Sequence, residues 1–225
     1  CAESGGCRRG KSMRPQKEIL EIFDILSAND PAPKSELEYS NAFTLLVAIM
    51  LSAQSTDKGV NKATKELFKV ADTPAKMAAL GVEKLKEYIK TIGLYNNKAK
   101  NVIAMSEILV RDYGGEVPEE QEKLESLPGV GHKTANVLRN VWFGKPTMAV
   151  DTHVFRIAHR LDFSQGKTVE AVEKDLLKAL PEKYLMYANH WLVLFGRYVC
   201  KAQKPKCAEC LLAQFCRSED KNIQF

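Results

Sequence analysis

Apolar residues recur along most of the chain at the spacing of amphipathic helices, and sustained strand-like alternation is rare. Ile19, Ile22, Phe23 and Leu26 fall on one face of a first predicted helix, and an apolar stretch runs from Phe43 to Leu51. The connections are short and no internal repeat is present. The pattern therefore predicts an all-α fold.

Capping residues indicate where several predicted helices begin and end. Thr73 and Pro74 form a typical helix start, and Gly81 suits the end of that helix. Further helices are expected over residues 82–91, 97–113, 119–126, 132–143 and 184–199, with Asp151 and Thr168 placed to cap two more. Function is therefore expected at helix ends and at the junctions between helices.

The composition is that of a globular protein: of 225 residues, 45% are hydrophobic and 27% are charged. The longest nearly unbroken apolar run, residues 42–51, is too short to span a membrane, and the N-terminus lacks the apolar stretch of a signal peptide. Collagen, coiled coils, secreted disulfide-linked domains and membrane proteins are excluded on these grounds. We expect a soluble protein without membrane contact, and a monomer.

Residues 1–12 are rich in Gly and Ser and differ in composition from the rest of the chain. We interpret them as an expression tag or a disordered extension, with a natural start at Met13. A lipid-modified Cys1 is the alternative. This segment carries three positive charges and one negative, so without it the net charge falls from +5 to +3. Such a charge is compatible with nucleic-acid binding but does not argue for it.

Four cysteines, Cys200, Cys207, Cys210 and Cys216, lie within seventeen residues near the end of the chain. A disulfide framework would spread its cysteines across a domain, so this grouping indicates the ligands of one metal centre in a reducing compartment. Zinc accepts four thiolates, and so does a cubane iron–sulfur cluster. The spacing alone does not distinguish the two.

Three lysines, Lys201, Lys204 and Lys206, lie in the loop between the first two of these cysteines. They form either a solvated surface or a group of cations placed to meet the phosphates of a nucleic-acid backbone. By themselves the lysines favour the solvated surface.

The segment LPGVG, residues 127–131, separates two predicted helices. Gly129 and Gly131 allow a tight turn around Val130 and leave backbone N–H groups uncovered. Together with the next helix N-terminus, where His132 lies, these groups form a candidate phosphate site. A plain turn between helices is the alternative. The preceding Leu-Pro and the lysine in the next helix favour phosphate binding, which would position a duplex without reading its sequence.

Lys133 and Asp151 are the candidate catalytic residues. A lysine near a helix N-terminus faces the positive end of the helix dipole, which disfavours its protonated form, and partial burial would act in the same direction. Lys133 is therefore a candidate amine nucleophile, with an ordinary exposed lysine as the alternative. Asp151 is either a simple N-cap or a carboxylate that activates the amine or stabilises positive charge on a sugar.

Together these residues resemble the endonuclease III family of DNA repair glycosylases over essentially all of residues 13–216. The motifs that carry the resemblance are LLVAIMLSAQSTD (45–57), YIKTIGLYNNKAKN (88–101), LPGVGHKTANVL (127–138), AVDTHVFR (149–156) and the cysteine group. The resemblance implies two helical domains flanking a DNA-binding cleft. A six-helix domain over residues 35–145 would end in a helix–hairpin–helix motif. Residues 13–34 and 146–225 would form the other domain, which holds a [4Fe–4S] cluster rather than zinc.

The resemblance further implies a base-excision-repair DNA glycosylase with AP lyase activity that removes oxidised pyrimidines from damaged double-stranded DNA. Lys133 would attack C1′ of the flipped nucleotide, and β-elimination from the resulting Schiff base would cut the strand 3′ to the site. Asp151 would assist the attack and stabilise the transition state. Gln54 and Leu94 match positions that fill the gap in the duplex.

Three further expectations come from the same resemblance. His132 stands where many members carry Arg, which predicts a weaker or pH-dependent phosphate contact. The cluster is expected to be structural, to position the basic loop on DNA and to lie outside the chemistry. The location implied is the cytoplasm, in association with the bacterial nucleoid.

Three alternatives remain beside this interpretation. An adenine-mismatch glycosylase shares the hairpin, the Asp and a similar cysteine group, but typically lacks the lysine at position 133 and carries an extra C-terminal domain. Lys133 and the short segment after Cys216 count against it. A non-catalytic helix–hairpin–helix DNA-binding module would be expected to lose Lys133 or Asp151. A zinc-bound structural protein would be colourless, whereas an iron–sulfur protein is brown.

Overall fold

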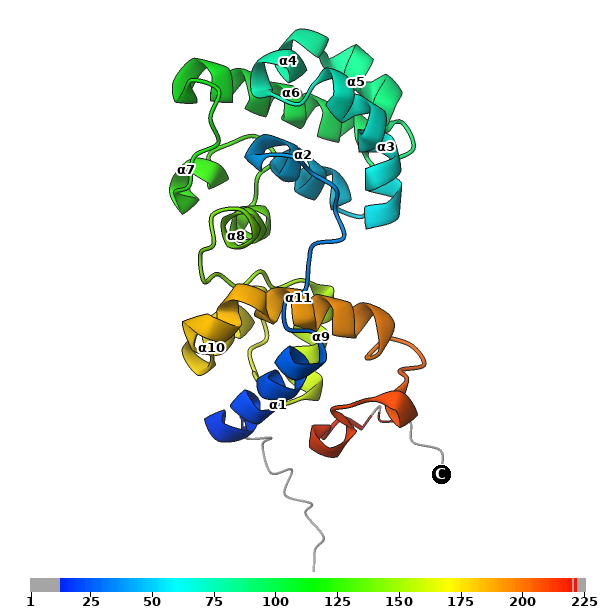
Figure 1. Cartoon of the computed structure of the whole chain (residues 1–225), viewed down its shortest axis with the longest axis vertical. Helices are drawn as coiled ribbons and strands as arrows, with labels where there is room; N and C mark the ends of the chain where they lie inside the picture. The colour runs from blue at the N-terminus through cyan, green and yellow to red at the C-terminus, as the bar shows by residue number, and fades with distance from the viewer. Residues whose placement is uncertain (1–12, 220, 222–225) are drawn as a thin grey trace, which may run out of the picture. The chain divides into compact units, whose positions relative to one another are not determined.

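The computed structural model describes residues 13–219 and residue 221, and all of its regular elements are helices. The predicted all-α fold is confirmed, while the predicted extension over residues 1–12 lies outside the described residues. The α-helices, labelled in Figure 1, are α1 Gln16–Asn29, α2 Ala42–Ser52, α3 Asp57–Val70, α4 Pro74–Leu80, α5 Val82–Ile89, α6 Tyr95–Tyr113, α7 Gln121–Glu125, α8 His132–Val141, α9 Thr152–Arg160, α10 Val169–Ala179 and α11 Glu182–Tyr198. Two short 3-10 helices, Cys207–Glu209 and Ala213–Phe215, come after α11.

The chain divides into two compact units. One unit, which we call the hairpin unit, runs from Lys34 to Ala149 and contains α2 to α8. The other, the cluster unit, joins the residues up to Pro33 with those from Val150 onward. Residues 34–149 therefore contain seven helices where the resemblance implied six, and α7 is the shortest at five residues. The predicted domain boundaries stay a prediction.

The core of the hairpin unit is built around α2. Asn41 and Thr44 form a capping box at its start, since each side chain accepts a hydrogen bond from the backbone of the other residue. Every residue from Phe43 to Leu51 is buried, because α2 packs against α3, α6 and α8 (Figure 1). A helix that is apolar on all sides requires such surroundings, and the apolar stretch in the sequence is thereby explained.

The core of the cluster unit is built where α1 and α9 pack against α11. Phe23 of α1 is fully buried and contacts the rings of Phe163, Tyr184 and Trp191, with ring centroids 5.7, 5.9 and 6.2 Å away. Trp191 Nε1 donates to the carbonyl of Asp30 at 2.7 Å, which satisfies its polar end. The apolar face predicted for the first helix is the one that is buried.

One helix, α3, escaped the sequence analysis, although its signals are present. Thr56 caps it by accepting from the backbone N–H of Gly59, and its buried residues recur at helical spacing: Val60, Ala63, Thr64 and Leu67. Two predicted helices also end earlier than expected, α5 at Ile89 and α8 at Val141. The remaining predicted helices are found within a few residues of their expected bounds.

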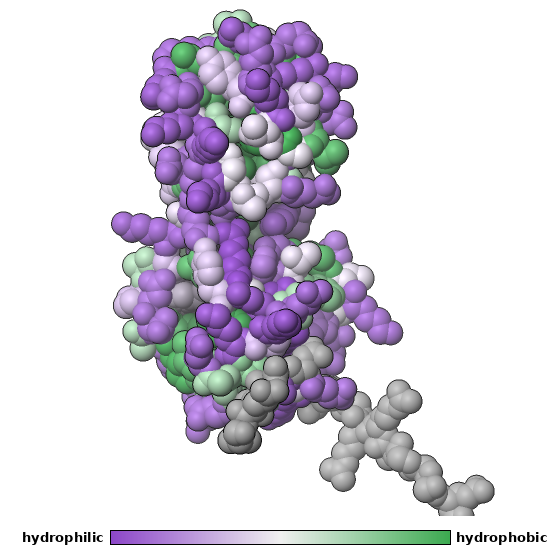
Figure 2. Space-filling model, turned by 90° about the vertical axis from the view of Figure 1, so that its right-hand side faces the viewer, coloured by the Kyte–Doolittle hydropathy of each residue, from purple (hydrophilic) through white to green (hydrophobic). Residues whose placement is uncertain are grey.

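The surface of the described residues is mostly polar. Figure 2 shows one face, on which hydrophilic side chains predominate and apolar side chains gather in smaller patches. Among the helices that the structure describes, none combines the length and the apolar character that crossing a bilayer requires.

Candidate DNA-binding and iron–sulfur sites

The hairpin between α7 and α8 is anchored by its apolar residues. Leu127 and Val130 are buried, and the N–H of Val130 donates to the carbonyl of Leu127 at 3.1 Å. The side chain of Val130 belongs to the core of the hairpin unit, so only its backbone could take part in the expected phosphate site, and that part stays a prediction. The backbone of Gly129 and Gly131 is exposed and suits a phosphate.

The two glycines of the hairpin differ in whether their position would accept a side chain. Gly129 has φ +76°, and a Cβ there would lie 2.8 Å from Asn101 Cβ and 3.0 Å from Met50 Cε, so neither the backbone nor the space accepts a side chain. Gly131 has φ −94°, and a Cβ there would meet no atom within 4 Å. Only Gly129 is therefore required by the packing of the hairpin unit.

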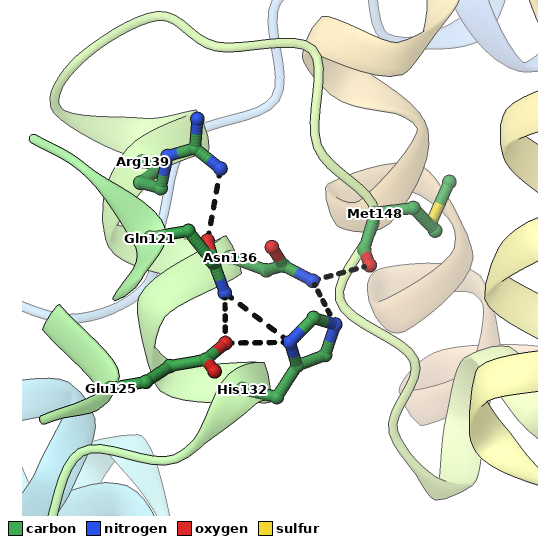
Figure 3. Close-up of polar contacts among 6 residues, drawn as sticks. All are labelled: Gln121, Glu125, His132, Asn136, Arg139 and Met148. Carbon is green, nitrogen blue, oxygen red and sulfur yellow. Dashed lines mark hydrogen bonds and ion pairs between the residues drawn. The ribbon is translucent and has the colours of Figure 1, made fainter. Parts of the chain in front are cut away.

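His132 begins α8 and joins a polar network with α7, drawn in Figure 3. Its Nδ1 lies 2.7 Å from Glu125 Oε1, and Gln121 donates to the same carboxylate. Arg139 in turn donates to Gln121 Oε1 at 2.9 Å. The hydrogen bond from Gln121, and next the one from His132, lower the pKa of the Glu125 carboxyl.

The other side of the His132 ring faces Asn136. The Asn136 amide nitrogen donates to the buried carbonyl of Met148 at 3.2 Å and lies 3.2 Å from His132 Nε2 (Figure 3). An amide nitrogen is only a donor, and the Gln121 amide nitrogen likewise lies 3.3 Å from His132 Nδ1, so donors approach the ring from both sides (Figure 3). Thr147 donates to the carbonyl of Asn136 at 2.7 Å. The segment that leads out of the hairpin unit is therefore fixed to α8.

The two candidate catalytic residues come from different units. Lys133 is the second residue of α8 and is exposed, so the partial burial considered for it is not found. Asp151 is the N-cap of α9, and its Oδ1 accepts from the N–H groups of His153 and Val154, both at 2.9 Å. The capping role expected for Asp151 is confirmed, and it fixes the orientation of the carboxylate.

Gln54 and Leu94 lie at the tips of two neighbouring loops. Both are exposed, with 60% of Leu94 accessible, and both have left-handed backbone angles, φ 56° for Gln54 and 57° for Leu94. A Cβ added to Gly93 would stand 3.4 Å from the carbonyl of Gln54, so the two loops are in close contact. Non-glycine residues rarely adopt this conformation, and it concentrates at functional positions.

The four cysteines after α11 line one open pocket. Burial raises the pKa of the Cys210 thiol, and the neighbouring thiols of Cys200, Cys216 and Cys207 raise it further, as expected for four thiols sharing a small space. Within residues 13–219, no three His, Cys, Asp or Glu side chains converge closely enough to hold a single ion. A four-iron cluster spreads its thiolate ligands more widely, and this pocket fits such a group.

Two arginines of α9, which the sequence analysis passed over, hold the start of the cysteine loop. Arg156 Nε donates to the carbonyl of Cys200 at 3.1 Å. Arg160 Nη1 donates to the Cys200 sulfur at 3.4 Å and to the carbonyl of Lys201 at 2.7 Å. Their spacing of four residues on one helix face, inside the AVDTHVFR motif and just after it, was the signal that could have found them. The three loop lysines, Lys201, Lys204 and Lys206, are exposed.

The family of the chain is shown by its similarity to known proteins. Residues 47–182 match the HhH-GPD superfamily base excision DNA repair protein, and residues 200–216 match the iron-sulfur binding domain of endonuclease III. Endonuclease III of Rickettsia felis is 56% identical over 88% of this chain and 93% of its own length. Endonuclease III of Escherichia coli K12 is 54% identical over 90% and 96%. The chain belongs to the endonuclease III family.

Solved structures of endonuclease III bound to DNA share this fold. A trapped endonuclease III–DNA covalent intermediate is 44% identical, with a TM-score of 0.86 over 91% of this chain and 97% of that one. A non-covalent endonuclease III–DNA complex gives 44% identity and a TM-score of 0.87 over 91% and 96%. The protein is thus a DNA glycosylase and AP lyase of base excision repair, and its cofactor is a [4Fe–4S] cluster. The expectation of iron–sulfur over zinc is confirmed.

Proposed function

We propose that Lys133 and Asp151 carry the chemistry of this DNA glycosylase and AP lyase, and that its substrates are oxidised pyrimidines in double-stranded DNA. The observation that carries the proposal is the place of Lys133. It is exposed in the first turn of α8, two residues after Gly131, whose exposed backbone suits a DNA phosphate. An amine held there reaches a nucleotide on the same strand.

In the proposed reaction, the neutral amine of Lys133 attacks C1′ of the flipped nucleotide, and the bond from C1′ to the damaged base breaks, so that the base leaves. The C1′–O4′ bond of the sugar then opens to give a Schiff base between Lys133 and C1′. Loss of a C2′ proton from this Schiff base expels the 3′ phosphate, and this β-elimination cuts the strand 3′ to the site. Asp151 assists deprotonation of the amine and stabilises positive charge on the sugar. Its cap bonds to His153 and Val154 support this role because they hold the carboxylate in one orientation.

Further contacts with DNA are proposed for the hairpin, the two loop tips and the cysteine loop. The backbone of Gly129 and Gly131 binds a phosphate, and His132 adds a weaker contact that depends on pH. Gln54 and Leu94 fill the gap left by the flipped nucleotide, which their exposed positions at loop tips support. Phosphates also lie against the lysines of the cysteine loop, Lys201, Lys204 and Lys206.

The [4Fe–4S] cluster supplies a structural link rather than a step of this reaction. Cys200, Cys207, Cys210 and Cys216 are its proposed ligands, and their pocket supports the assignment. We also propose that the protein acts as a monomer, without membrane contact, in the cytoplasm in association with the bacterial nucleoid.

The test uses a duplex with one thymine glycol and borohydride present during the reaction. Wild-type protein is expected to form a covalent adduct, because borohydride reduces the Schiff base, and Lys133→Ala is expected to form none. Lys123→Ala, an exposed lysine of α7, is the matched control and should behave like the wild type. Base release without an adduct would assign a monofunctional reaction to the protein and leave Asp151 to carry it alone.

A further inference from the structure

Lys98, in the first turn of α6, is the buried lysine of the hairpin unit. Only 8% of it is accessible, and its ammonium donates three hydrogen bonds. Lys98 Nζ lies 2.9 Å from the carbonyl of Leu51, 2.5 Å from the carbonyl of Ala53 and 3.3 Å from Ser55 Oγ. All three acceptors belong to the end of α2 and the loop that carries Gln54.

These contacts explain why a charged group is tolerated there. The carbonyls at a helix C-terminus carry partial negative charge and lack partners within their own helix, and an ammonium has three donors to offer them. Burial still costs free energy and lowers the pKa of the Lys98 ammonium. A long apolar side chain could fill the same space without that cost, so the charge itself must be useful in this position.

The backbone of the same residue contacts the second loop. The N–H of Lys98 donates to the carbonyl of Leu94 at 3.1 Å, and Leu94 is the N-cap residue of α6. Lys98 therefore contacts both loop tips, the Gln54 loop through its side chain and Leu94 through its backbone. Gly93 adds a direct contact between the loops, close to the carbonyl of Gln54.

Both loop tips need such support. Gln54 and Leu94 are non-glycine residues with left-handed backbone angles, a conformation that is strained relative to relaxed backbone. Such conformations persist only where surrounding contacts hold them. For Gln54, the single buried ammonium of Lys98 provides such contacts, because it donates to residues on both sides of Gln54 in the chain.

We propose that Lys98 is a positioning residue, whose ammonium holds the Gln54 loop in register with Leu94 so that both enter the gap left by a flipped nucleotide. The inference rests on the proposed gap-filling role of those two residues. It assigns no contact between Lys98 and DNA, since the side chain is buried.

The first experiment compares binding of the cluster-loaded full chain to two duplexes. One carries a stable tetrahydrofuran analogue of an abasic site and the other is undamaged. Lys98→Met is expected to reduce the preference for the abasic duplex about tenfold while leaving affinity for undamaged DNA within about twofold, because hairpin and phosphate contacts are unchanged. Lys98→Arg keeps the charge and several donors, so most of the preference should return.

Controls separate positioning from general damage to the fold. Lys65→Met makes the same substitution at an exposed position of α3 and should bind both duplexes like the wild type. If Lys98→Met is unfolded at the assay temperature, Ser55→Ala replaces it, since this change removes one acceptor and should lower the preference by about threefold. Equal weakening on both duplexes by either variant would overturn the inference.

A double-mutant cycle decides whether Lys98 acts through Gln54. If it does, Lys98→Met together with Gln54→Ala lowers the abasic preference no further than the more severe single variant. If the double variant instead loses the product of the two single-variant factors, Lys98 and Gln54 act independently and the inference is overturned. If Gln54→Ala and Leu94→Ala both keep the full preference, the gap-filling proposal is wrong and this inference fails with it. If Gln54→Ala and Leu94→Ala lose the abasic preference and Lys98→Met keeps it, only the proposed role of Lys98 is wrong.

Discussion

At the scale of single residues, Asp151 combines a structural and a proposed chemical task in one carboxylate. Its Oδ1 accepts two backbone N–H groups at the start of α9, which makes it a good N-cap. The same bonds orient the negative charge that the proposed reaction requires. The two tasks differ in what they need, because an amide can cap a helix but cannot accept a proton.

Substitution of Asp151 should separate these tasks. Asp151→Asn keeps an oxygen for the cap and is expected to unfold at the wild-type temperature while excising thymine glycol at least about 100-fold more slowly. Asp151→Ala should lose excision equally and also lose about 1 kcal/mol of stability. Single-turnover excision and thermal unfolding check both. Near-normal excision by Asp151→Asn would contradict the proposed role.

Glu125 gives a prediction about pH. The hydrogen bond from Gln121, and next the contact with His132, lower the pKa of its carboxyl, so the folded state binds a proton less readily than the unfolded state. Its contribution to stability is therefore present above the ordinary pKa of an unfolded glutamate and is lost as the pH falls through the lower pKa of the folded state. Glu125→Gln should flatten the acid side of the stability profile. Urea unfolding between about pH 6 and pH 3 measures the free energy of unfolding of both proteins. If that free energy falls with pH as steeply in Glu125→Gln as in the wild type, the prediction is wrong.

At the scale of secondary-structure elements, helix ends provide the candidate catalytic and gap-filling residues. Lys133 lies at the start of α8, Asp151 caps α9, Leu94 caps α6, and Gln54 lies just beyond the end of α2. Helix ends expose backbone groups and partial charges that a helix interior does not, which suits them to bind phosphate and to hold side chains in fixed directions.

The two glycines of the hairpin element should respond differently to alanine. Gly129→Ala is expected to cost about 1–3 kcal/mol of stability, because it forces a left-handed alanine against Asn101 and Met50. Gly131→Ala should change stability by less than about 0.5 kcal/mol, since its Cβ meets open space. Both should weaken DNA binding. Chemical denaturation and duplex-binding titrations measure the pair, and equal stability losses would contradict the packing described for Gly129.

At the scale of the whole molecule, the proposed cluster ligands all lie in the cluster unit, whose chain segments are far apart in sequence. Arg14, buried before α1, donates to the carbonyl of Leu161 at 2.7 Å and also to the carbonyl of Phe215 in the cysteine loop. The loop itself contains only two 3-10 helices of three residues each. The cluster is therefore expected to stabilise this unit and not the other.

Removal of the iron–sulfur cluster tests whether it stabilises the cluster unit alone. Oxidative loss of the cluster is expected to remove hydrogen-exchange protection from residues 200–216. Protection of α1 and α9 should also fall, because Arg14, just before α1, and Arg160 of α9 both contact the cysteine loop. Protection of α2 and α6 should be unchanged. Exchange measured by mass spectrometry, segment by segment, separates the two units. Equal loss in both units would show that the cluster stabilises the whole chain.

The sequence by itself determined most of the helices, several of their caps, the hairpin and the family. Thr73, Asp151 and Thr168 cap the helices that they were predicted to cap, and the apolar face of Ile19, Ile22, Phe23 and Leu26 is buried. These features depend on residues within one or two turns of each other, so their chemistry can be read along the chain. The signals of α3 were equally local and were overlooked.

The tertiary structure decided what depends on residues distant in sequence. The close approach of Asn101 to Gly129, the Cys200 contacts of the two α9 arginines and the three acceptors of Lys98 all depend on the tertiary fold. In each case the partner lies well outside the local helix or turn. A lysine in a polar sequence is usually solvated. Only the packing of α6 against α2 buries Lys98 and lets its ammonium donate hydrogen bonds to backbone carbonyls.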